Sequence, residues 1–132
     1  MIFRNNNRDR IHICDLRLRT FIGIHPRERQ KKQPILVNIV LHAGLRKAGK
    51  SDDFRDAVDY QAVAARIRQI VEKFRFNLLE ALAERIAETC LEFEDVRQAD
   101  VRVDKPGALR HARSAGVKIS RRPAKLTLRR RR

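Results

Sequence analysis

Apolar and polar residues alternate in four stretches of the chain, the pattern that predicts half-buried β-strands. In the first stretch the alternation shifts at Asp15, where we expect an offset or a bulge. The first two stretches lie on either side of a charged loop, residues 25–33, and are expected to pair as a hairpin. The predicted strands are residues 10–24, 34–43, 97–104 and 115–121.

Between the second and third predicted strands, apolar residues recur at the spacing of a helix that buries one face. Residues 60–74 and 77–93 show this pattern and are predicted to form two amphipathic helices. Asn77 lies three positions before Glu80, a capping-box spacing that predicts Asn77 as the N-cap of the second helix. An acid at this place also suits the positive end of the helix dipole.

These elements follow one another in the order β-β-α-α-β-β, which predicts an α+β fold. We expect a four-stranded antiparallel sheet with both helices on one of its faces. A chain of 132 residues is long enough for one hydrophobic core, so we assign one folded domain to residues 10–121. So small a sheet leaves two edges open, and we therefore expect the subunits to assemble into a ring or barrel.

The net charge of +15 is concentrated toward the ends of the chain. The last twelve residues carry seven Lys or Arg and no acid, whereas residues 11–120 have a net charge of only +6. We interpret residues 1–9 as a flexible N-terminus and residues 122–132 as a basic C-terminal tail. Such a tail is either solvated or binds a polyanion, such as a nucleic acid, a membrane surface or an anionic substrate.

The cysteines and histidines show no spacing typical of a metal site, and we predict none. Cys14 and Cys90 are isolated, and we expect both to be buried free thiols of a protein in a reducing cytoplasm. The polar start of the chain is neither a signal peptide nor a membrane span. The four histidines are scattered, at His12, His25, His42 and His111.

Four residues are candidates for chemistry, and each also has a simpler structural explanation. Lys105 ends a strand just before Pro106, so it is either exposed to solvent or held at the rim of the sheet for a reaction. Glu28 is the only acid in a long basic interval, and is either a solvated loop residue or an ionised base. Tyr60, the only tyrosine, either packs or meets a flat ligand. Glu80 either stabilises its helix start or accepts two parallel N–H bonds from a ligand.

Several motifs resemble dihydroneopterin aldolase and its sister enzyme, dihydroneopterin triphosphate 2'-epimerase. They occur in the family's order and together extend over roughly residues 10–121. Glu28 is matched by its spacing from Gly23 and because it is the sole acid in its loop, which is more basic than usual for the family. The arginine-rich tail has no counterpart in the resemblance. The motifs are "LRLRTFIGI", "GKSDDFRDAVDYQAVA", "RFNLLEALAE" and "VDKPGALRHARSAGVKIS".

The resemblance implies a tunnelling fold, in which subunits form a barrel, two tetrameric rings stack into an octamer, and pterin sites lie between neighbouring subunits. Glu80 and the backbone of Leu79 would anchor the pterin. Tyr60, with the backbone of Val58 and Asp59, would come from the neighbouring subunit. No cofactor and no metal is implied, and the expected partners are a pterin substrate and further copies of the chain, without a membrane.

The implied reaction is the retro-aldol cleavage of 7,8-dihydroneopterin into 6-hydroxymethyl-7,8-dihydropterin and glycolaldehyde, a step of folate biosynthesis. Lys105 would act as general acid and base through a bound water, with Glu28 positioning that network and Tyr60 delivering a proton to the intermediate. The substrate's own ring C=N accepts the electrons, so neither a metal nor a lysine Schiff base is needed.

Three other functions remain open. The epimerase would use the same intermediate, and a triphosphate would need clustered cations, such as Arg27, Arg29, Lys31 and Lys32. A zinc-dependent pterin synthase of the same fold would need three convergent histidines, which the scattered histidines do not predict. A basic nucleic-acid-binding protein would explain the tails but not the order of the motifs, so we expect nucleic acid to contact the tail at most.

Overall fold

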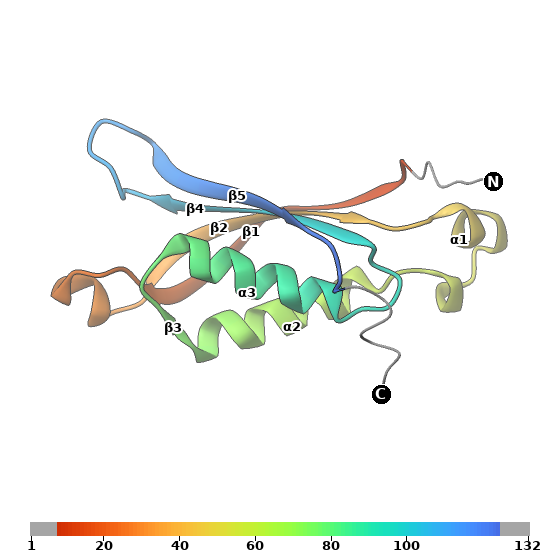
Figure 1. Cartoon of the computed structure of the whole chain (residues 1–132), viewed down its shortest axis with the longest axis horizontal. Helices are drawn as coiled ribbons and strands as arrows, with labels where there is room; N and C mark the ends of the chain where they lie inside the picture. Colours follow the sequence, from red (N-terminus) through yellow and green to blue (C-terminus); the bar gives the residue numbers. More distant parts are fainter. Residues whose placement is uncertain (1–7, 125–132) are drawn as a thin grey trace.

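A curved sheet of five strands forms one layer of the protein in the computed structural model, which describes residues 8–124 (Figure 1). The strand order is β3-β1-β2-β4-β5, with β1 and β3 parallel and the other neighbours antiparallel. The expected antiparallel sheet of four strands is therefore corrected to a mixed sheet of five. The strands are β1 (Arg10–Ile22), β2 (Gln33–His42), β3 (Arg75–Phe76), β4 (Gln98–Pro106) and β5 (Ser114–Arg121).

The β1–β2 hairpin contains the predicted bulge. The pairing register shifts between Ile13 and Leu16, and Asp15 adopts a φ of 52°. The Asp15 backbone N–H donates to Asn38 Oδ1 at 2.8 Å, and Asn38 Nδ2 donates to Asp15 Oδ1 at 3.2 Å. These two bonds from β2 hold the extra residue, so the positive φ is stabilised locally.

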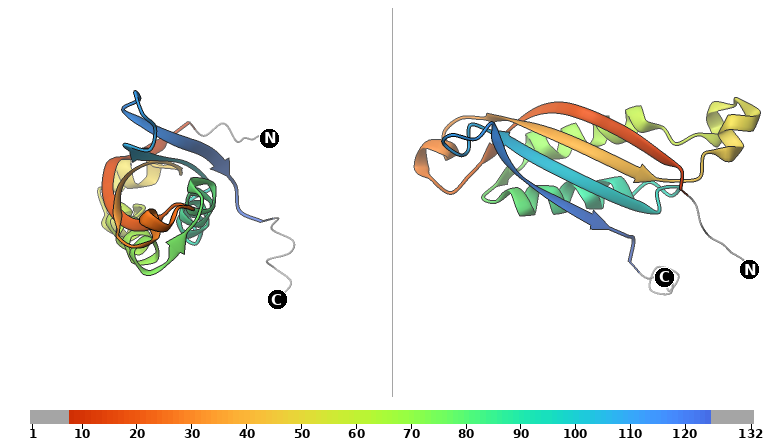
Figure 2. Two further views of the ribbon diagram at one scale, coloured as in Figure 1. Left: turned by 90° about the vertical axis from the view of Figure 1, so that its left-hand side faces the viewer. Right: turned by 90° about the horizontal axis from the view of Figure 1, so that it is seen from above.

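Two long helices, α2 (Tyr60–Lys73) and α3 (Leu79–Leu91), cover one face of the sheet, as predicted (Figure 1). Figure 2 shows the sheet curving around them. Every second residue of β2 is buried against the helices, and each such side chain contributes roughly 1.5–3 kcal/mol relative to exposure. The largest fully buried side chains include Ile35, Ile39, Leu41, Ile67, Leu82 and Ile86.

The structure adds short elements that the sequence pattern did not indicate. They are the helix α1 (Arg46–Ser51) and two 3₁₀ turns, η1 (Pro26–Arg29) and η2 (Phe54–Asp56). None of the three buries a residue, so none leaves an apolar period in the sequence. The parallel strand β3 has only two residues, too few for an alternation to be visible.

Two local predictions are wrong. Leu78, not Asn77, is the N-cap of α3, and no side chain caps this helix. Asn77 Oδ1 instead accepts a hydrogen bond from Arg29 Nη1 at 2.9 Å. Cys14, expected to be buried, is exposed next to the bulge, whereas Cys90 is buried as expected, and burial raises the pKa of its thiol to about 12.

The expected terminal segments fall largely outside the described residues, because residues 1–7 and 125–132 are not among them. Within residues 8–124 no helix is long and apolar enough to span a membrane. In the same part of the chain, no cluster of three or more His, Cys, Asp or Glu side chains is arranged to hold a metal ion.

Candidate active site

Lys105 is buried at the end of β4, with only 9% of its surface exposed. Side chains alternate between the two faces of a strand, so Lys105 lies on the same face as Val101 and Val103, the face that the helices cover. Its position at the strand end places the ammonium where the apolar core stops. A lysine buried at such a place requires an anionic partner.

Glu28, in the turn η1, is that partner. Its Oε2 contacts Lys105 Nζ, and its Oε1 accepts a hydrogen bond from the His25 backbone N–H at 3.2 Å. The hydrogen bond from Lys105 lowers the pKa of the Glu28 carboxyl; partial burial acts in the opposite direction, and the His25 N–H reinforces the lowering. Glu28 is therefore ionised at neutral pH and supplies the negative charge beside the buried lysine.

Gly23 provides the space that the Glu28 side chain occupies. Its φ is +133°, a conformation that other L-residues rarely adopt. A Cβ atom built on Gly23 would lie 2.1 Å from Glu28 Oε1 and 2.8 Å from Glu28 Cβ. The spacing of these two residues in the sequence thus reflects a direct contact in the structure.

Glu80 and Leu79 lie in the first turn of α3, at the same end of the molecule as η1 and the turn after β4 (Figure 1). Glu80 is exposed and Leu79 is half-buried. The first backbone N–H groups of a helix have no partner within the helix, so the Leu79 N–H lies among the free donors at this end. A carboxylate beside free backbone donors can bind a ligand that has both N–H and C=O groups.

Tyr60, Val58 and Asp59 lie at the opposite end, where α2 begins. The 14 residues of α2 extend over about 21 Å, so one chain does not bring Tyr60 to Lys105. Val58 is buried, and Asp59 Oδ1 accepts the Ala62 N–H at 2.9 Å as the N-cap of α2.

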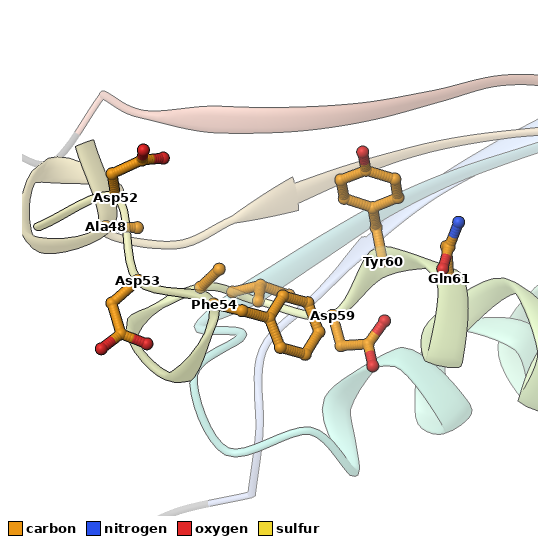
Figure 3. Close-up of a pocket in the computed structure, with 9 residues that line it drawn as sticks. Ala48, Asp52, Asp53, Phe54, Asp59, Tyr60 and Gln61 are labelled. Carbon is orange, nitrogen blue, oxygen red and sulfur yellow. The ribbon is translucent and has the colours of Figure 1, made fainter.

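A pocket of about 480 Å³ surrounds the start of α2 (Figure 3). Tyr60 is 56% exposed and its ring projects away from the helix start, and Phe54 is 70% exposed. Two exposed aromatic rings beside one pocket can stack on a flat ligand or on another subunit. The lining residues are Ala48, Asp52, Asp53, Phe54, Ala57, Val58, Asp59, Tyr60 and Gln61.

Sequence reasoning missed a set of contacts that joins η1 to the start of α3. Besides the bond from Arg29 to Asn77, Arg75 Nη1 donates to the Arg29 backbone carbonyl at 3.1 Å. The Arg75 guanidinium also lies 3.9 Å from the centre of the Phe21 ring. Arg29 and Asn77 are 48 positions apart, and no local pattern indicates such a pair.

The loop around Glu28, residues 25–33, is rich in cations. Arg19 Nη2 donates to the Lys32 carbonyl at 2.9 Å, and Lys32 Nζ lies 6.0 Å from the Phe21 ring. An uncompensated positive surface beside Lys105 favours an anionic ligand. Within residues 8–124, no carboxylate forms an ion pair with Arg27, Arg29, Lys31 or Lys32.

The profile of the dihydroneopterin aldolase family matches residues 11–120. The chain is 42% identical over 110 residues to dihydroneopterin triphosphate 2'-epimerase of Escherichia coli K12, covering 83% of this chain and 92% of that protein. It is also 42% identical over 100 residues to dihydroneopterin aldolase of Streptomyces coelicolor, covering 76% of this chain and 84% of that protein. Among solved structures, E. coli dihydroneopterin aldolase in complex with neopterin is similar, with a TM-score of 0.82 and 34% identity over 86% of this chain and 98% of that chain.

Proposed function

The chain belongs to the dihydroneopterin aldolase family, and we propose that it cleaves 7,8-dihydroneopterin into 6-hydroxymethyl-7,8-dihydropterin and glycolaldehyde. One observation carries this proposal: Lys105 is buried and ion-paired with Glu28 at the end of the sheet where α3 begins. Catalytic groups need a fixed geometry and a controlled charge, and this pair has both. We assign the pterin-binding domain to residues 10–121, which the family profile nearly spans.

The reaction breaks the bond between carbons 1' and 2' of the substrate's side chain. The Lys105 ammonium gives a proton to the ring nitrogen of the C=N bond, and the resulting amine takes the proton of the 2'-hydroxyl through a water. A carbonyl forms at carbon 2', and the electron pair of the broken bond moves into the protonated ring system. Glu28 orients Lys105 and the water, so that the same amine carries out both proton transfers.

The second step converts the enol-like intermediate into product. Tyr60 delivers a proton to carbon 1', the ring nitrogen releases its proton to solvent, and solvent reprotonates Tyr60. Glu80 and the Leu79 backbone bind the amino and ring N–H groups of the pterin throughout, because an ionised carboxylate accepts two parallel N–H bonds. E. coli dihydroneopterin aldolase was crystallised with neopterin, which supports a pterin ligand here.

The site requires a second subunit, because Tyr60 and Lys105 lie at opposite ends of one chain. The outer edge of β5 and the part of β1 that β3 leaves unpaired both expose backbone donors and acceptors. We place these two edges against each other, so that four subunits close a barrel and two barrels stack into an octamer. Two free thiols and a pterin substrate fit a protein of the reducing cytoplasm.

A second candidate function is the 2'-epimerisation of dihydroneopterin triphosphate. The cations around Glu28 favour it, because in the described part of the chain no carboxylate forms an ion pair with them, and they can bind phosphate. The chemistry needs no additional residue: the aldehyde stays bound and is added back to the intermediate through its other face, so that the configuration at carbon 2' is inverted.

Product analysis tests both functions. The purified protein is incubated separately with 7,8-dihydroneopterin and with its triphosphate, and hydroxymethyldihydropterin is separated from the 2' epimers. Dominant cleavage of the unphosphorylated substrate supports the aldolase; inversion of the triphosphate with little cleavage supports the epimerase. No product from either substrate would contradict the proposal, and a Lys105→Ala variant purified in parallel controls for contaminating activity.

A further inference from the structure

We infer that Asn77 and Arg29 are positioning residues: their hydrogen bond holds the turn η1 in place so that the Glu28 carboxylate stays in contact with Lys105. The catalytic consequence rests on the proposed function, whereas the structural statement does not. Neither residue touches the reacting atoms in this scheme. Both act through Glu28, which immediately precedes Arg29 in the chain.

Packing does not hold η1 in place. This 3₁₀ turn has four residues and buries none of them, and the flanking His25 and Gln30 are exposed as well. A short turn without an apolar anchor explores many conformations unless polar contacts restrict it. The contact between Glu28 and Lys105 therefore depends on the hydrogen bonds that tie this turn to the rest of the protein.

Arg29 carries the bonds that tie η1 to β3 and the start of α3. Its Nη1 donates to Asn77 Oδ1 at 2.9 Å, and its backbone carbonyl accepts from Arg75 Nη1 at 3.1 Å. Arg75 is itself held in place by its stacking on Phe21 of β1. Both the side chain and the main chain of the residue after Glu28 are thus tied to rigid elements.

Asn77 is suited to join the two parts of the proposed site. It lies three positions before Glu80, and the Gly23 N–H donates to the adjacent Phe76 carbonyl at 3.1 Å. An Asn at the start of a helix commonly caps it, but this side chain is used for Arg29 and α3 has no side-chain cap. The hydrogen bond between Arg29 and Asn77 thus connects the turn that carries Glu28 to the residues just before α3, the helix that carries Glu80.

The first experiment measures the pKa of the Glu28 carboxyl by carbon-13 NMR in the full-length protein. In the wild type it should be lowered by Lys105, and in Asn77→Ala it should rise toward the ordinary glutamate value as the contact loosens. Asn77→Asp keeps an acceptor for Arg29 and should preserve the lowered value. Gln30→Ala is the matched control, because within residues 8–124 this exposed side chain of the same turn makes no hydrogen bond.

The second experiment measures kcat and KM for the substrate that the wild type turns over. Asn77→Ala should lower kcat about 10- to 100-fold with little change in KM, and should move the acid limb of the pH–rate profile to higher pH. With the unphosphorylated substrate Arg29→Ala should have the same effect, and the double variant should be no worse than either single variant. Thermal unfolding of each variant shows whether it is folded.

The outcomes separate this inference from the proposed function. An unchanged pKa of Glu28 in folded Asn77→Ala, or additive losses in the double variant, would overturn the positioning role. If the wild type turned over neither substrate, the proposed function would fail, and the NMR titration would still decide whether Asn77 positions Glu28.

Discussion

The ammonium of Lys105 contacts the carboxylate of Glu28, a residue 77 positions earlier in the chain. The strand β4 carries one partner and the exposed turn η1 carries the other. The contact lowers the pKa of the Glu28 carboxyl, so this residue is a carboxylate at neutral pH. The two partners lie on different elements. A substitution of one partner therefore leaves the element that carries the other partner unchanged.

Lys105→Ala should lose catalysis while retaining pterin binding. In the proposed mechanism Lys105 moves both protons of the cleavage step, and one such group contributes roughly 10²- to 10⁴-fold in rate. We expect kcat to fall within this range and the Kd for neopterin, measured by fluorescence titration, to stay close to the wild-type value. Lys118→Ala, at an exposed position of β5, is the matched control. Normal turnover by Lys105→Ala would contradict the mechanism.

Glu80→Ala should lose pterin binding. A pair of hydrogen bonds to a carboxylate contributes several kcal/mol, so the Kd for neopterin should rise about 100-fold or more. Glu88→Ala removes an exposed carboxylate from the same helix, two turns further along, and should leave the Kd unchanged. Equal affinities for the two variants would show that Glu80 is not the anchor.

Gly23→Ala should displace Glu28 and reduce activity. The new Cβ would lie 2.1 Å from Glu28 Oε1, and alanine is strained at a φ of +133°, at a cost of about 1–3 kcal/mol. We expect a lower midpoint of urea unfolding and a kcat at least tenfold below wild type. In the control Gly49→Ala, the added Cβ meets no atom within 4 Å, and the helix α1 should be slightly stabilised. Wild-type kcat in Gly23→Ala would show that Glu28 does not need this space.

The main elements of the fold could be predicted because they bury apolar side chains at a regular period. This holds for the long strands, for α2 and α3, and for the bulge at Asp15, where the period visibly shifts. The helix α1 and the turn η1 bury no residue, and β3 is only two residues long, so no period marks them. Exposed elements are positioned by specific polar contacts, which residue order alone does not reveal.

The candidate site could also be predicted in part. The strand pattern placed Lys105 at the rim of the sheet, and the family resemblance pointed to Glu28 as its companion. Asn77 illustrates the limit of such predictions. Its spacing to Glu80 fits a capping box, but its Oδ1 accepts a hydrogen bond from Arg29, which is distant in the sequence, and does not cap α3. The roles of the site residues remain predictions that the variants above test.

Asp100 should make the stability of the protein depend on pH in acid. Partial burial acts to raise the pKa of this carboxyl, but hydrogen bonds from Gln98, His42 and Ser120 outweigh it and lower the value to about 2. The contribution to the free energy of unfolding, about 2 kcal/mol, is therefore complete above the ordinary pKa near 4 and is lost as the pH falls toward 2.

Urea unfolding of the wild type and of Asp100→Asn at two pH values measures this contribution. The variant should be about 2 kcal/mol less stable at pH 6 and only about 1 kcal/mol less stable at pH 3. Asp95→Asn, at an exposed position, should cost little at either pH. The same penalty for Asp100→Asn at both pH values would show that its carboxyl titrates normally.

Two inactive variants should restore activity when their subunits are mixed. Tyr60 and Lys105 lie at opposite ends of one chain, so a site that uses both must take them from two subunits. In an oligomer reassembled from equal amounts of Tyr60→Ala and Lys105→Ala, about a quarter of the sites combine an intact Tyr60 with an intact Lys105. We expect activity near that fraction after the mixture is unfolded and refolded together. A mixture of Lys105→Ala with Glu28→Ala, whose changes lie at the same end, should regain far less, because each site takes both residues from one subunit. If the two mixtures recovered equally, or if the first recovered no activity, the prediction would be wrong. The site would then lie within a single chain, or Tyr60 would not belong to it.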